Sequence, residues 1–198
     1  MANEAIVTPA FTAAFTSVFK PKGIKGDPSA PLKYSVAMLF PKGDKIEALR
    51  ELMLKAAHDK WGKERAEKYM ANPKFKNPIK DQGDMAEQYA GFVDGAVYIQ
   101  ASNSDKPGLI DNRNQDIIDE DDFYSGCLAR AQVQCYAWEH PVGGKGCSFS
   151  LLNVQKLRDG ERLGGGRAKA QNVVEPVEWV DDGSEAPAKP KTADSIWD

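Results

Sequence analysis

Aromatic side chains stand beside basic ones at several points of this 198-residue chain. Arg130, Tyr136 and Trp138 share one side of an alternating stretch, and Phe75 lies between two lysines. An aromatic ring offers a flat face on which a nucleobase stacks, while a lysine or arginine neutralises a phosphate. Together these residues predict a surface that holds one nucleic-acid strand without reading its sequence.

The predicted DNA-contacting residues come from five separate stretches, so the fold must bring them together. They are Lys20, Lys22, Lys25, Lys33, Tyr34, Lys74, Phe75, Lys76, Arg130, Tyr136, Trp138, Lys156 and Arg158. For any single ring, a place in the core is an equally good explanation, and a lone lysine often only solubilises. The set as a whole favours a nucleic-acid face.

Alternation of apolar and polar residues predicts five strands, at residues 11–19, 32–40, 95–101, 127–138 and 147–157. In the fourth strand one side is entirely small and apolar, from Cys127 to Ala137, which suits the inside of a narrow barrel. At residues 45–61 and 63–70 the apolar residues recur with the spacing of a helix, and Asp44 is placed to cap the first helix. This order predicts a mainly β protein, a five-stranded OB-fold barrel with a helical insert at about residues 44–71. A β-sandwich remains an alternative.

Charge divides the chain in two, despite a formal net charge of only −3. Residues 175–198 hold seven acids against two lysines, whereas residues 1–174 hold 24 basic and 22 acidic groups. The acidic end has too few apolar residues to fold alone. We expect an OB-fold single-strand-binding domain at residues 1–170 and a disordered acidic tail at 171–198.

The tail ends in large apolar residues between acids, which suits contact with a partner protein. The predicted partner-binding residues are Asp194, Ile196, Trp197 and Asp198. The expected partners are single-stranded DNA and, through this tail, replication or recombination proteins. A mobile acidic arm could also compete with phosphates for the basic groove. A homodimer is left open.

Several other classes of function find little support. The acids from Asp111 to Asp122 could bind metal in a nuclease, but consecutive acids in one loop point in divergent directions. Cys135, His140 and Cys147 lack the paired spacing of a zinc site. We therefore expect no enzyme and no cofactor, with a metal-dependent nuclease or a β-sandwich assembly protein as the alternatives.

The expected location is the cytoplasm, without membrane association. The longest apolar runs are too short to cross a bilayer, and the first residues do not resemble a signal peptide. Cys127, Cys135 and Cys147 are an odd number without close spacing, which predicts reduced, buried thiols.

The chain resembles the OB-fold single-stranded-DNA-binding proteins of tailed phages, including a family long catalogued as a domain of unknown function. The resemblance lies in the early Phe-rich strand, the helical insert at 45–61, and the last strand with its following turn, Ser148–Glu161. The ending Asp-Ser-Ile-Trp-Asp is similar in kind to the tails of bacterial and T7-like phage single-strand binders, but it places Asp198 after the tryptophan. The resemblance implies a role in phage DNA replication, recombination and repair.

Overall fold

The structure is a computed structural model that describes residues 4–23, 29–43 and 46–164. The described residues all belong to one unit, which spans residues 1–166. Lys25, Asp44 and the whole predicted tail, with Asp194, Ile196, Trp197 and Asp198, lie outside the described residues. What is expected of them therefore stays a prediction.

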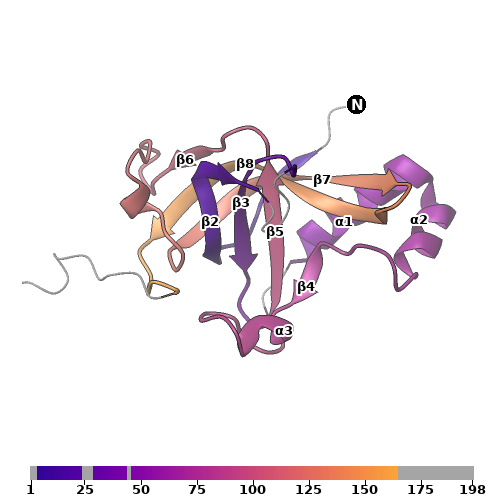
Figure 1. The fold of residues 1–198 in the computed structure, drawn as a ribbon, viewed down its shortest axis with the longest axis horizontal. Coiled ribbons are helices and arrows are strands. Elements are labelled where there is room, and N and C mark those ends of the chain that lie inside the picture. Colours follow the sequence, from indigo (N-terminus) through magenta and orange to yellow (C-terminus); the bar gives the residue numbers. More distant parts are fainter. Residues whose placement is uncertain (1–3, 24–28, 44–45, 165–198) are drawn as a thin grey trace, which may run out of the picture. The chain divides into compact units, whose positions relative to one another are not determined.

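Strands dominate the described residues, and the helices are grouped between the third and fifth strands (Figure 1). The strands are β1 (Ala5–Val7), β2 (Phe11–Lys22), β3 (Lys33–Leu39), β4 (Ile79–Asp81), β5 (Val97–Asn103), β6 (Gly108–Ile110), β7 (Leu128–His140) and β8 (Gly144–Arg158). The helices are α1 (Glu47–Trp61), α2 (Lys63–Met70) and α3 (Gly83–Ala86), with a 3-10 turn, η1 (Glu120–Asp122).

The five long strands close into a ring, as expected of an OB-type barrel. β2 pairs with β3, and β3 with β5, both antiparallel. β5 pairs with β8 in parallel, β8 pairs antiparallel with β7, and β7 returns to β2. Two separate sheets, as in a β-sandwich, would not be joined in this way. The predicted mainly β fold with a helical insert is confirmed.

The alternation in β7 determines which side of the barrel wall faces inward. Ala131, Val133 and Cys135 are buried, and each lies opposite a large buried residue of β8: Val154, Leu151 or Phe149. Small side chains on one strand leave room for larger ones on its neighbour, so the narrow interior fills without voids. All three cysteines are free and buried. A hydrogen bond with Cys147, together with burial, raises the pKa of the Cys135 thiol.

The helical insert covers one end of this wall. Leu49, Met53 and Ala57 of α1 are buried in the same core as the barrel strands, as their helical spacing predicted. α1 begins at Glu47, with Ile46 at its N-terminus and no side-chain cap. Figure 1 shows α1 and α2 beside the far end of the long β7–β8 hairpin, whereas β6 lies toward the other end.

Residues 82–96 cover the outside of β2 and β3. The sequence pattern predicts no helix or strand for most of this segment. Buried Gln82 fastens it, because the side-chain amide donates to the carbonyls of Phe40 (3.0 Å) and Val97 (2.7 Å). The Gln82 oxygen accepts from the backbone N–H of Val93 at 2.9 Å. A second, smaller core forms here from Ala14, Ala37, Leu39 and Phe92.

Candidate nucleic-acid interface

The outer face of the β7–β8 hairpin carries a row of polar and aromatic side chains. Arg130 lies opposite Gln155 and donates to its side-chain oxygen at 2.7 Å, and Gln132 accepts from Asn153 at 2.7 Å. Tyr136 lies opposite Ser148 and is 37% exposed. From Leu128 to His140 this face runs for about 40 Å. The structure therefore places Arg130, Tyr136 and Trp138 on one strip, as their spacing predicted.

At the end of the hairpin where the turn joins β7 to β8, this strip meets the loop after α2. We define the hairpin-end surface as Tyr69, Lys74, Phe75, Lys76, Trp138 and Lys145. Backbone bonds join its two parts: the Lys76 N–H donates to the Lys145 carbonyl at 2.9 Å, and the Cys147 N–H donates to the Lys76 carbonyl at 3.2 Å. The predicted residues Lys74, Phe75, Lys76 and Trp138, separated by some sixty residues of chain, are thus neighbours.

Gly146 allows this close approach. A β-carbon added at Gly146 would lie 2.6 Å from Cβ of Lys76 and 2.8 Å from Cζ2 of Trp138. The Trp138 indole N–H also donates to the Ser148 hydroxyl at 2.9 Å. The ring is therefore held over a glycine and presented at the hairpin end in one orientation.

Aromatic rings and lysines border a hollow of about 270 Å³ in the hairpin-end surface. Tyr69, Phe75, Lys74 and Lys145 line it, and Trp61 packs edge-to-face against Tyr69 and Phe75, with centroids 5.4 and 6.3 Å away. Lys145 Nζ lies 4.7 Å from the Tyr69 centroid and also pairs with Glu139. This hydrogen bond lowers the pKa of the Glu139 carboxyl. Within the described ranges, neither Lys74 nor Lys76 has an ion pair.

A second group of predicted residues lies where β2 and β3 end. Lys22 pairs directly with Lys33 across the two strands, and like charges in that position repel each other. The ion pairs found among the described residues include neither of these lysines, so a phosphate between them would relieve the repulsion. Lys20 instead pairs with Glu120 at 2.7 Å, and Tyr34 is half-buried beside Lys33.

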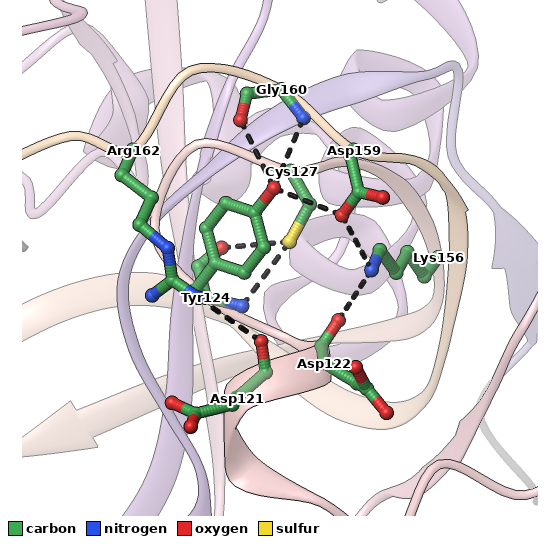
Figure 2. Close-up of polar contacts among 8 residues, drawn as sticks. All are labelled: Asp121, Asp122, Tyr124, Cys127, Lys156, Asp159, Gly160 and Arg162. Atoms are coloured by element: carbon green, nitrogen blue, oxygen red, sulfur yellow. Dashed lines mark hydrogen bonds and ion pairs between the residues drawn. The ribbon is translucent and has the colours of Figure 1, made fainter. Parts of the chain in front are cut away.

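At the opposite end of the hairpin, the cations are held by acids and carbonyls (Figure 2). We call residues 111–122 together with Lys156, Arg158, Asp159 and Arg162 the acidic end. Lys156 contacts the Asp159 carboxylate at 2.8 Å and the Asp122 carbonyl at 2.6 Å, and its side chain is only 13% exposed. Arg158 shares a hollow with Asp111, Asp116, Asp119, Asp122 and Asp159. The structure therefore gives Lys156 an intramolecular role and surrounds Arg158 with acids.

Tyr124 is the centre of this arrangement. Its hydroxyl donates to the Asp159 carboxylate at 2.9 Å, and the Arg162 guanidinium lies 4.0 Å from its ring centroid. Burial, reinforced by the bond to Asp159, raises the pKa of the Tyr124 phenol. In the part of the chain that the structure describes, no group of three or more His, Cys, Asp or Glu side chains is arranged to hold a metal ion. No helix there is both long and apolar enough to span a membrane.

Sequence reasoning missed two exposed rings on the outside of β2 and β3. Phe15 and Tyr89 are 43% and 41% exposed and meet edge-to-face, with centroids 5.0 Å apart. Regular alternation from Phe11 onward predicts that Phe15 lies on the same side of its strand as Phe11, which is buried. A register shift between Ala14 and Ser17 adds one residue to β2 and turns Phe15 outward. No local sequence signal marks this bulge.

A known protein family matches the chain over most of its length. The family model of the Enterobacter phage Enc34 ssDNA-binding protein matches residues 4–185. Protein p50 of Acyrthosiphon pisum secondary endosymbiont phage 1 is 34% identical over 160 residues, covering 77% of this chain and 83% of its own.

Two solved structures share the fold. The single-stranded DNA-binding protein from bacteriophage Enc34, in complex with ssDNA, superposes with a TM-score of 0.66 at 20% identity, covering 80% of this chain and 88% of its own. Gp2.5, a single-stranded DNA-binding protein encoded by bacteriophage T7, gives a TM-score of 0.58 at 16% identity, covering 90% and 99%.

Proposed function

We propose that this chain, which belongs to the family of the Enterobacter phage Enc34 ssDNA-binding protein, binds single-stranded DNA without sequence preference. It acts as a DNA-binding protein rather than an enzyme, coating DNA strands during phage replication. Participation in recombination and repair, and a location in the host cytoplasm, belong to the same proposal.

The observation that carries the proposal is the hairpin-end surface. Its lysines 74 and 76 have no ion pair in the described ranges, and they stand beside the exposed side of Phe75 and the fixed ring of Trp138. Base stacking contributes about 1–3 kcal/mol per base, and cations on either side neutralise the phosphates between bases. The outer strip of β7 extends this surface from Tyr136, two residues from Trp138, to Arg130 near the acidic end of the hairpin.

Sequence independence follows from the kind of contact. Every base has a flat face, and every nucleotide has the same phosphate, so rings and lysines bind any strand. Reading base edges would need donors and acceptors fixed against a groove. In duplex DNA the bases are stacked on one another and their faces are not available to protein rings, so we expect a preference for single strands.

The test is a fluorescence titration with oligo-dT and with a duplex of equal length, with and without magnesium. We expect tighter binding to oligo-dT, an affinity that falls as salt rises because bound phosphates release counterions, and intact DNA at the end. Equal affinity for both DNAs, or an affinity independent of salt, would contradict the proposal. Magnesium-dependent degradation would identify a nuclease instead.

We further propose that the acidic tail recruits replication or recombination proteins and competes with DNA for the basic surfaces. The supporting observations are its charge and its apolar residues Ile196 and Trp197. Deleting residues 175–198 should tighten oligo-dT binding and abolish retention of a phage or host replication protein in a pull-down. A truncated chain that binds DNA more weakly would rule out the competition.

A further inference from the structure

From the geometry around Phe15 we infer a second base-stacking site on the outside of β2, formed by Phe15 and Tyr89. This outer ring pair would hold bases of the same single strand while Lys22 and neighbouring cations bind its phosphates. The inference rests on the proposed function and adds a site that lies away from the hairpin-end surface.

The backbone at Phe15 is the first observation. Its φ of 47° lies in the left-handed region, which a bulky side chain rarely adopts because Cβ crowds the following carbonyl. Such a conformation costs free energy and persists where the surroundings impose it, often at sites of function. Here the cost places a phenylalanine ring on the surface, although burying it would have been more favourable for folding.

The second observation is the rigid support behind the two rings. Phe92 packs against Phe15 at 5.8 Å and against Tyr98 at 5.5 Å between centroids, and it is buried in the smaller core. The three hydrogen bonds of Gln82 fasten the segment that carries Tyr89 and Phe92 to β3 and β5. Because the support is fixed, little side-chain freedom is lost when a base stacks on the exposed ring faces.

The third observation is a basic hollow that begins next to Phe15. It has a volume of about 320 Å³ and runs along β2 from Thr16 to Lys22, with Arg162 and Leu163 on its other side. Leu163 joins the two features, since it lines the hollow and also packs against the smaller core. Lys20, Lys22 and Arg162 line the hollow together with one acid, Glu120, which pairs with Lys20. Arg162 contacts the Asp121 carbonyl and the Tyr124 ring, which do not neutralise its charge, so Lys22 and Arg162 leave the hollow positively charged and suited to phosphates.

The arrangement of the rings and the cations indicates which kind of ligand binds here. Exposed rings at one end and two cations, Lys22 and Arg162, along the continuing hollow match the alternation of bases and phosphates in a single strand. An apolar protein surface would cover the rings, but it would supply no anions to pair with the cations. We therefore assign the outer ring pair to nucleobases.

The experiment compares two kinds of oligomer at equal length and salt: oligo-dT and an abasic strand of the same sugar–phosphate backbone. The variants are Phe15→Asn and Tyr89→Ala, which remove one ring each; asparagine tolerates the left-handed backbone. Leu54→Ala, which removes a 39%-exposed apolar side chain from α1, is the matched control. Thermal unfolding of each variant establishes that it is folded.

We expect each ring variant to lose about tenfold in affinity for oligo-dT and nothing for the abasic strand, with an unchanged salt slope. Lys22→Gln should weaken both oligomers and reduce the salt slope, because it removes a phosphate contact. The Leu54 variant should bind like the unmodified protein.

Three results would overturn the inference. Ring variants that bind oligo-dT as tightly as the unmodified protein would show that no base stacks there, while the proposed function would stand. Equal losses on both oligomers would assign the rings to folding. A ring variant that changes the sedimentation coefficient of the protein would show that a second copy covers the rings. Failure of the unmodified protein to bind oligo-dT would instead contradict the proposed function.

Discussion

The two ends of the β7–β8 hairpin carry similar numbers of cations in very different surroundings. At the hairpin-end surface, Lys74 and Lys76 stand beside rings and lack ion pairs within the described ranges. At the acidic end, Lys156 and Arg162 are held by Asp159, by backbone carbonyls and by the ring of Tyr124. We therefore expect Lys74 and Lys76, rather than Lys156, to bind phosphates, because the charge of Lys156 is already neutralised within the protein.

The largest effect should come from reversing charge at the hairpin-end surface. Replacing Lys74 and Lys76 by glutamate removes two cations and adds two repelling charges, so oligo-dT affinity at low salt should fall at least about tenfold. The slope of log affinity against log salt should decrease by about 1.4, since each single-strand phosphate contact contributes about 0.7. Titrations at four salt concentrations measure both quantities, and an unchanged slope would remove this surface from the interface.

The next largest effect on DNA affinity should come from removing an aromatic ring of the outer strip. Tyr136→Ala should cost about 1–3 kcal/mol of binding to oligo-dT if a base stacks on the exposed phenol. Because the side chain carries no charge in this role, the salt slope should stay the same. Phenylalanine at this position serves as the control and should retain the affinity. A loss of affinity in both variants would point to the hydroxyl rather than to stacking.

The acidic end should respond in stability rather than in DNA affinity. Lys156→Met leaves the Asp159 carboxylate and the Asp122 carbonyl without their cation and should reduce the free energy of unfolding by about 1–2 kcal/mol. Urea unfolding measures this change, and oligo-dT titration should give the affinity of the unmodified protein. A tenfold weaker affinity in a folded variant would place Lys156 in the interface after all.

The smallest effect should come from Glu139, the acid that pairs with Lys145 of the hairpin-end surface. Glu139→Gln frees Lys145 from its ion pair, so oligo-dT should bind about twofold tighter at neutral pH. The pKa of Glu139 is lowered, so its charge is present above the ordinary carboxyl range and is lost only as pH falls through the lowered value. The difference between the two proteins should therefore vanish at acidic pH, and a difference that persists there would contradict this explanation.

The pattern of residues along the chain was sufficient to predict the barrel wall and the composition of its outer strip. Strict alternation in β7 separated Ala131, Val133 and Cys135 from Arg130, Tyr136 and Trp138, because successive side chains of a strand point to opposite faces. α2 was predicted with its observed bounds, and α1 within two residues, because their apolar stripe is a local feature. The short strands β1, β4 and β6 were missed, since three residues carry almost no periodic signal.

Long-range packing, in contrast, determines which of the predicted residues lie together on the surface and which are held within the protein. Lys74, Phe75 and Lys76 gained their place beside Trp138 through backbone bonds between a loop and a distant hairpin. Lys156 is held by the backbone carbonyl of Asp122, 34 residues before it in the sequence, and by the carboxylate of Asp159. Phe15 was turned outward by a bulge that depends on its pairing with β3. Each of these outcomes depends on long-range packing, and the alternation of residues along a single strand contains no information about which distant chain segment will lie against it.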